Sequence, residues 1–362
     1  MGKISGKSLA EKYLDFQEPC VTVLAGGREI PAGKGIYLDY TEVISSVGPQ
    51  PDMAVLCYRA GRYTEQDFTL LEGCLAVGQR MEVLTGYAGQ ESRIFLGYLH
   101  QVEAVDGMRD YVEYILTCLD VKGLMKKNNA LRISGAQKAQ QQLEDILGQS
   151  CYRSLVEKKK IETLPKELNQ DCVINGETHY DWLCGLAARA DYEFFCGRGE
   201  MVFRKARRQG PDCLELAVEY GLLEVRGTVT MAEQTGYVQV CGYNRMDEKA
   251  AGRAEWPGTP GPFAGGIRQA LRGIGLCLRD PEAETGEQAK QRAKTMMERR
   301  AGRCSRIRAV NLGIPELRPG ILADITAGNA ESLSGRIYVE EVRHLLDETG
   351  YRSVAEGVRL KA

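Results

Sequence analysis

The residues that most often carry out chemistry in proteins are few or scattered in this sequence. It contains three histidines, His100, His179 and His344, and no cysteine lies at metal-ligand spacing from any of them. Neither H-E-x-x-H nor G-x-S-x-G occurs, and the carboxylates form no obvious pair. We therefore predict no catalytic residue, no metal site and no cofactor. His100 and His344 are interpreted as structural, and His179, in the first turn of a predicted helix, as solvated or capping.

One glycine-rich stretch and one basic stretch resemble ligand-binding motifs, but each lacks residues that its motif requires. AGGREIPAGKG, residues 25–35, has Arg28 where a phosphate-binding loop needs glycine, and Gly35 where it needs Ser or Thr. We interpret it as a hairpin loop. RKARR, residues 204–208, is the densest basic cluster, but no aromatic residues alternate with it as nucleic-acid binding would require. A solvated hairpin end is the favoured interpretation, with a polyanion site as the alternative.

Composition favours a globular protein made and kept in a reducing cytoplasm. The chain has 362 residues, enough for two or three domains, and a net charge of −2, so no basic field indicates nucleic acid or an anionic membrane. No stretch approaches the ~20 apolar residues of a membrane span, and the polar N-terminus predicts no export signal. Twelve cysteines occur without C-x-x-C spacing and mostly in apolar runs, which predicts buried, reduced thiols.

The order of elements predicts a mainly β protein with an α+β insert. Short strand-like runs over 20–118 indicate a small antiparallel barrel or sandwich, which we place in a first domain, 1–130. Residues 131–225 form the insert. Its helices are predicted over 134–150, ending near Gly148, and over 178–190, with Thr178 and Asp181 as the capping pair, followed by a Gly-Arg-Gly hairpin.

A second β-domain is predicted over 226–362. Its strands flank a Pro- and Gly-rich loop, 255–266, and a helix over 285–303 whose capping box is Thr285 and Gln288. The segments that start at Gly78 and Gly320 share a spaced set of glycines and apolar residues, each followed by a strand with a histidine and by a turn with Asp and Gly. This pattern predicts an internal repeat, although any two successive β-hairpins share much of it.

The ordered motifs of the last two thirds carry a resemblance to a known family. The helix 285–303 is followed by a strand, then by GIPELRPG at 313–320, and then by GRIYVEEVRH. THYDWLCGLAARADYEFF and GYVQVCGYN precede them in the chain. This set is similar to baseplate hub proteins of contractile injection systems, that is, phage late control gene D proteins and the N-terminal hub part of the type VI secretion valine-glycine repeat spike. The resemblance covers about three quarters of the chain.

The resemblance implies a structural role and specific partners. Hubs of this family are homotrimers with two tube-type β-barrel domains per subunit, so that six similar units dock on a sixfold tail-tube ring while the threefold axis fits a spike. We expect a separate trimeric spike protein and other baseplate proteins as partners, with assembly in the bacterial cytoplasm and neither nucleic acid nor membrane as a partner. Gly313, Pro315, Pro319 and Gly320 are predicted to form a stiff, non-pairing connection at a barrel rim.

Two other functional classes stay open at this stage. A glycan- or receptor-binding β-protein at a tail tip would have the same strand-rich composition. A tail-associated cell-wall hydrolase is the less favoured alternative, because no catalytic constellation can be identified.

Overall fold

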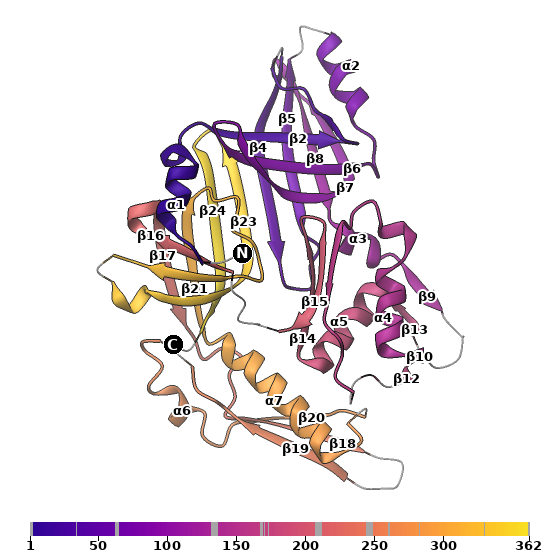
Figure 1. Ribbon diagram of the computed structural model, residues 1–362, viewed down its shortest axis with the longest axis vertical. Helices are drawn as coiled ribbons and strands as arrows, with labels where there is room; N and C mark the ends of the chain where they lie inside the picture. Colours follow the sequence, from indigo (N-terminus) through magenta and orange to yellow (C-terminus); the bar gives the residue numbers. More distant parts are fainter. Residues whose placement is uncertain are drawn as a thin grey trace. The chain divides into compact units, whose positions relative to one another are not determined.

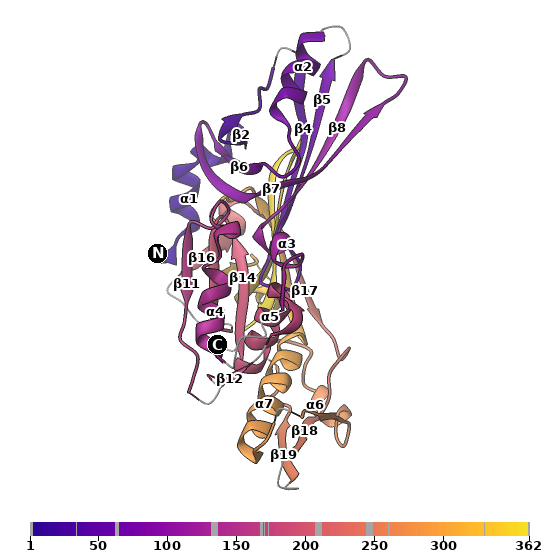
Figure 2. The same cartoon turned by 90° about the vertical axis from the view of Figure 1, so that its right-hand side faces the viewer.

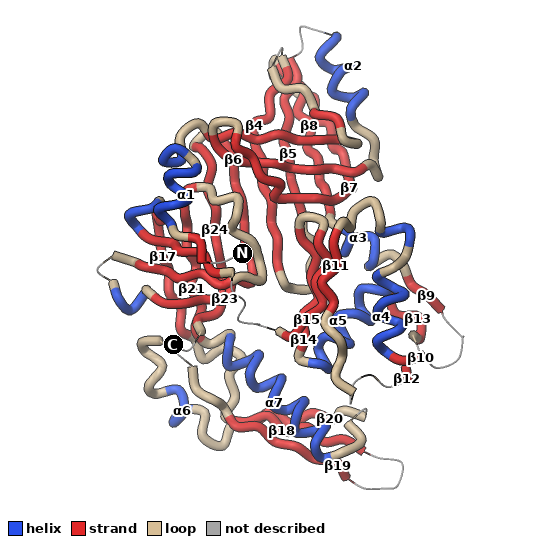
Figure 3. Tube along the Cα trace, viewed as in Figure 1, coloured by secondary structure: helices blue, strands red, loops and turns tan. Residues whose placement is uncertain are grey.

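Strands dominate the computed structural model of the chain, as the sequence predicts, and the helices are distributed along it (Figures 1 and 3). The structure describes residues 3–33, 35–61, 65–131, 137–166, 169, 171–172, 174–206, 212–243, 249–259, 261–281, 283–328 and 330–360. Two compact units make up the chain. Unit 1 consists of 1–214, 310–321 and 339–355, and unit 2 of 215–309, 322–338 and 356–362. The predicted domain boundaries at 130 and 225 stay a prediction.

The first six-stranded arrangement accounts for the strand-rich N-terminal third. In spatial order its strands are β2 (Pro19–Ala25), β6 (Arg80–Tyr87), β7 (Gln90–Asp106), β8 (Tyr111–Leu119), β5 (Met53–Gly61) and β4 (Ile36–Ser46). Each neighbouring pair is antiparallel. The shift between Leu38 and Tyr40 and that between Leu99 and Gln101 are bulges, which bend a strand locally.

Alternating burial along these strands forms the core of this sheet. In β5 every second residue is buried, and Leu56 is fully buried. The helix α2 (Glu65–Cys74) supplies Leu71, which is also fully buried in the same cluster. The sequence predicts mostly strands over 20–118. That prediction is wrong for residues 65–74, which form this helix.

The middle of the chain is an α+β element as predicted. Helix α4 (Ala139–Leu147) ends at the C-cap Gly148, and α5 (His179–Ala190) begins after Thr178, whose hydroxyl accepts from the Asp181 amide. The sequence predicts that this helix spans 134–150, whereas the observed helix begins at Ala139. Residues 134–136 of the predicted helix lie outside the described residues. Strands β14 (Tyr192–Gly197) and β15 (Glu200–Lys205) form the predicted hairpin, with β11 (Lys158–Ile161) parallel to β15.

A second arrangement of six strands repeats the order of the first. Its strands are β16 (Cys213–Ala217), β17 (Leu222–Val229), β21 (Ser305–Leu312), β22 (Leu322–Thr326), β23 (Gly335–Asp347) and β24 (Gly350–Arg359). Their spatial order is β16-β22-β23-β24-β21-β17. With β2, β4, β5, β6, β7 and β8 matched to these in chain order, the two spatial orders are identical. The predicted repeat therefore appears as a duplicated strand topology.

The long helix α7 (Gly286–Gly302) packs on a separate sheet in unit 2. Thr285 and Gln288 form the predicted capping box. The sheet has the order β19-β18-β20, with β18 at Tyr237–Tyr243, β19 at Lys249–Glu255 and β20 at Gly275–Arg279. At Gly252 a side chain would collide with the α7 backbone at Lys290, so the glycine permits the close approach of strand and helix.

The remaining elements are short. They are β1 (Lys3–Ile4), α1 (Gly6–Lys12), η1 (Leu14–Phe16), β3 (Arg28–Glu29), α3 (Val121–Met125), β9 (Asn129–Leu131), β10 (Gln137–Lys138), η2 (Ser150–Tyr152), β12 (Asp171–Cys172), β13 (Asn175–Thr178), η3 (Val218–Tyr220), α6 (Ile267–Ala270) and η4 (Glu331–Leu333). The predicted loop over 255–266 lies between β19 and α6, with residue 260 outside the described residues.

Candidate functional site

The segment Gly313–Gly320, singled out from the sequence, connects β21 to β22 and is largely buried. Ile314 is 2% exposed and Leu317 is fully buried, so the segment is a packed element of unit 1. Gly320 has φ 81°, the left-handed conformation that the sequence predicts for it. Gly313 does not have a positive φ. It is needed because a Cβ at this position would overlap the ring of Tyr351.

The expectation that this connection forms no backbone pairs is wrong for its two glycines. The Gly313 amide donates to the Tyr351 carbonyl at 2.9 Å, and the Gly320 amide donates to the Val339 carbonyl at 2.8 Å. Between them the Leu317 amide donates to the Ile314 carbonyl at 3.0 Å. Proline has no amide hydrogen, so Pro315 and Pro319 leave no donor unsatisfied in this buried place. A role of the four turn residues at a barrel rim stays a prediction.

His344 fastens this segment to the last two strands. Its ring is buried, with Nε2 3.0 Å from the Leu317 carbonyl and Nδ1 2.8 Å from the Tyr351 hydroxyl. A carbonyl only accepts, so Nε2 carries the proton and Nδ1 accepts from Tyr351. Burial, followed by the charge of Arg198, lowers the pKa of His344 to about 3. The ring is therefore neutral at pH 7 and structural, as predicted.

Arginines of the β14–β15 hairpin hold the same segment from another side. The two-residue turn has φ 54° at Arg198 and 84° at Gly199, as a tight hairpin turn requires. Arg198 donates to the Leu317 carbonyl at 2.7 Å, and Arg204 donates to the Gly320 carbonyl at 2.6 Å. Burial lowers the pKa of Arg198 to about 10, which leaves it charged at pH 7. The predicted hairpin turn therefore also holds the segment in place, through the hydrogen bonds of these two half-buried arginines.

A third contact to the segment comes from the N-terminal helix α1. The Lys12 ammonium lies 2.6 Å from Glu316 Oε1, and the Tyr13 hydroxyl donates to the same oxygen at 2.8 Å. Tyr13 is fully buried and stacks at a tilt against Tyr87, with ring centroids 5.4 Å apart. Elements from three distant parts of the chain therefore meet on residues 313–320.

A buried charge cluster lies at the end of the first sheet. Lys122, fully buried in α3, places its ammonium 2.7 Å from Asp52 Oδ1 and 3.6 Å from Asp120 Oδ2. Burial opposes the charged ammonium, but the two carboxylates outweigh it and the pKa of Lys122 is raised. This cluster was not predicted. The one sequence feature that indicates it is the D-x-K sequence that directly follows a strand.

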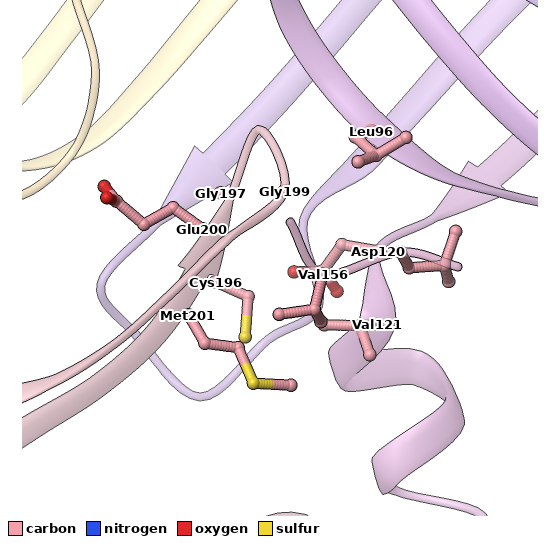
Figure 4. Close-up of a pocket in the computed structure, with 10 residues that line it drawn as sticks. Leu96, Asp120, Val121, Val156, Cys196, Gly197, Gly199, Glu200 and Met201 are labelled. Atoms are coloured by element: carbon pink, nitrogen blue, oxygen red, sulfur yellow. The ribbon is translucent and has the colours of Figure 1, made fainter. Parts of the chain in front are cut away.

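One cavity near these groups is lined by Ser45, Asp52, Arg198, Glu200 and Arg318 among others. It has a volume of about 30 Å³, which is enough for ordered water. Figure 4 shows a neighbouring site between the β14–β15 hairpin and Val121, where no space for a water remains. The arrangement can hold elements together and order a water.

The other residues considered from the sequence are distributed over the fold. His179 is 1% exposed and its Nδ1 lies 2.8 Å from the Tyr152 hydroxyl, so the solvated or capping interpretation is wrong. His100 is half-buried with its ring edge-on to Tyr98. Arg207 and Arg208 of the basic cluster lie outside the described residues.

The cysteines agree only in part with the prediction. All twelve are free thiols. Cys118, Cys196, Cys213 and Cys304 are buried, whereas Cys151 and Cys277 are exposed and the others are half-buried. Burial raises the pKa of the Cys196 thiol well above its usual range, so this thiol is a packing group.

Among the described residues, no group of three or more His, Cys, Asp or Glu side chains is placed to hold a metal ion. In the same part of the chain, no helix is both long and apolar enough to cross a membrane.

Comparison with solved structures identifies proteins of the same fold. A tail protein from Neisseria meningitidis MC58 superimposes with a TM-score of 0.70 at 12% identity, over 94% of this chain and 97% of that one. The 43 kDa tail protein of prophage MuSo2 from Shewanella oneidensis gives 0.68 at 14%, over 94% and 98%. A type VI secretion component of E. coli, described as similar to T4 tail proteins, gives 0.58 at 10%, over 94% and 77%.

No protein-family model and no curated protein matches the sequence. The similarity therefore lies in the fold, which the chain shares over nearly its whole length with phage tail proteins and a secretion-system component. This is the fold that the resemblance in the sequence predicted.

Proposed function

We propose that this protein is a structural hub of the baseplate of a contractile phage tail or a tail-like injection particle. Three copies adapt the sixfold tail tube to a threefold spike, which is a separate chain. The observation that carries the proposal is the duplicated strand order, in which β16-β22-β23-β24-β21-β17 repeats β2-β6-β7-β8-β5-β4. A chain with two equivalent six-stranded arrangements presents six of them when it forms a trimer. Such a trimer can match a sixfold partner although its own symmetry is threefold.

The contacts around residues 313–320 support a structural role for this segment. Its titratable groups are engaged in fixing backbone: His344 and Arg198 both bond the Leu317 carbonyl. We infer that the segment fixes the geometry of the protomer, so that its outer surfaces meet the tube, the spike and other baseplate proteins. Assembly in the bacterial cytoplasm, without nucleic acid or membrane, is part of the proposal.

The test is co-assembly with candidate tail-tube and spike proteins from the same genome. We expect electron micrographs of the mixture to show a threefold ring capped by the spike on one side and docked to tube rings on the other. A protein that stays monomeric and binds neither would contradict the proposal. Saturable binding on a glycan array would instead favour the receptor-binding alternative. Clearance of peptidoglycan that one acidic substitution abolishes would favour the hydrolase.

A further inference from the structure

In the described part of the chain, β17 and the distal part of β7 each have one edge without a backbone partner. Among the described residues, β17 pairs only with β21. The distal part of β7, Gln101–Val105, pairs only with β8, because β6 pairs with β7 no further than Tyr98. Figure 2 shows this end of β7 and β8 as a projecting hairpin.

Both free edges are long and exposed. Gln101, Glu103, Ala104 and Val105 of β7 are exposed, and Val105 keeps 42% of its surface accessible. In β17 five of the eight residues are exposed, with Leu223 at 56%. Neither stretch contains the Lys or Pro with which natural proteins commonly block an edge. An open edge of this kind presents unpaired backbone N–H and C=O groups, which can pair with another strand.

Two other edges are covered by short strands. The outer edge of β2 is paired with the two-residue strand β3, through Leu24–Glu29 and Ala25–Arg28. The equivalent edge of β16 is paired with the two-residue strand β1, in register from Lys3–Cys213. The sequence thus closes the edges at β2 and β16 and leaves those at β7 and β17 open, which indicates a specific occupant for the open ones.

The occupant is identified by a contact already present within the protomer. The first half of β23 pairs with β22, and its later residues Glu341–Leu346 pair antiparallel with Ser46–Thr41 of β4. In the duplicated order β23 corresponds to β7, and β4 corresponds to β17. The residues of β7 that are open, Gln101–Val105, are therefore the counterpart of the β23 residues that hold β4.

We propose that β17 of one copy pairs antiparallel with residues 101–105 of β7 in the next copy. This contact repeats between chains the β4–β23 contact made within one chain, and so continues the sheet around a ring. The inference rests on the proposed homotrimer and adds its interface. At the internal contact Arg343 pairs with Glu42. On the open edges β7 carries Glu103, and β17 carries Arg226, which pairs with Glu224 of its own strand at 3.1 Å and could also reach Glu103.

Disulfide trapping tests this interface. In a background with the exposed Cys151 and Cys277 changed to Ser, Glu103→Cys is combined in turn with Glu224→Cys, Arg226→Cys or Thr228→Cys, which covers neighbouring registers of an antiparallel pair. The control combines Glu103→Cys with Lys7→Cys, whose wild-type side chain on α1 is 71% exposed. After mild oxidation, denaturing gels separate single chains from covalent dimers and trimers.

We expect one of the three pairs to give covalent dimers and trimers at least tenfold more abundant than the control. If the untreated protein is a trimer and no pair exceeds the control, the interface lies elsewhere and this inference falls while the hub proposal stands. If the protein is a monomer at every concentration tested, both fall.

Discussion

Replacement of Lys122 by methionine is the sharpest test of the interior. Methionine keeps the length and most of the volume of the side chain but removes the ammonium that faces Asp52 at 2.7 Å and Asp120 at 3.6 Å. Both carboxyl side chains are 4% exposed, so water cannot replace the lost cation. Removing one partner of such a buried group costs about 3–5 kcal/mol of unfolding free energy. We expect a loss of this size at pH 7.

The pH dependence of Lys122→Met follows from the same two carboxylates. Burial already raises the pKa of Asp52 and of Asp120, and loss of the cation raises them further. An acid whose pKa is higher in the folded protein takes up a proton on folding, so the variant loses stability as pH rises. For each proton taken up on folding, the loss is at most about 1.4 kcal/mol per pH unit.

The assay is urea unfolding at pH 5, 6 and 7 in a Trp256→Phe background, so that the fluorescence reports Trp182, which is buried in unit 1. The matched control is Lys138→Met, which breaks a pair of similar distance, 3.1 Å, whose side chains are 58% and 57% exposed. A surface pair contributes about 0–1 kcal/mol. The reasoning is refuted if Lys122→Met is no less stable than Lys138→Met at pH 7 and shows the same pH slope as the wild type.

Two further predictions concern the segment that connects β21 to β22. Gly313→Ala forces a methyl group onto the Tyr351 ring and should cost at least about 3 kcal/mol, whereas Gly185→Ala, in a helix with open space around it, should stabilise by about 0.5–1 kcal/mol; comparable urea midpoints for the two would contradict the packing described. The pKa of His344 is lowered to about 3, so its contribution is complete above pH 6.5 and is lost as pH falls toward 3. His344→Gln should flatten the stability profile over that range, and an unchanged profile would count against the buried neutral ring.

Local structure could be predicted from the sequence where one residue pattern decides it. The capping pair at Thr178 and the capping box at Thr285 each place a helix start within a residue of the observed one, because a single side chain meets the first free amides. The hairpin at Arg198 follows equally from its Gly-Arg-Gly sequence. Helix α2 was missed because its packing against the sheet depends on few apolar positions, among them Leu71.

Contacts between distant parts of the chain could not be predicted in this way. The strand order requires β4 to pair with β23, about 300 residues later, and no local pattern encodes that partner. Arg198 looks like an exposed turn residue, but it is half-buried and donates a hydrogen bond to the Leu317 carbonyl. Lys122 is a similar case, since its burial depends on Asp52 from another strand connection. Long-range partners of this kind decide where polar residues can be buried.

The mass of the purified protein at micromolar concentration tests the central claim most directly. The claim is that one chain carries two equivalent six-stranded arrangements, so that three chains form a ring of six such arrangements. Sedimentation equilibrium or native mass spectrometry should give about 120 kDa, three times the 40.0 kDa chain. A species of 40.0 kDa that persists as concentration rises, or a closed assembly whose number of chains is not three, would contradict it.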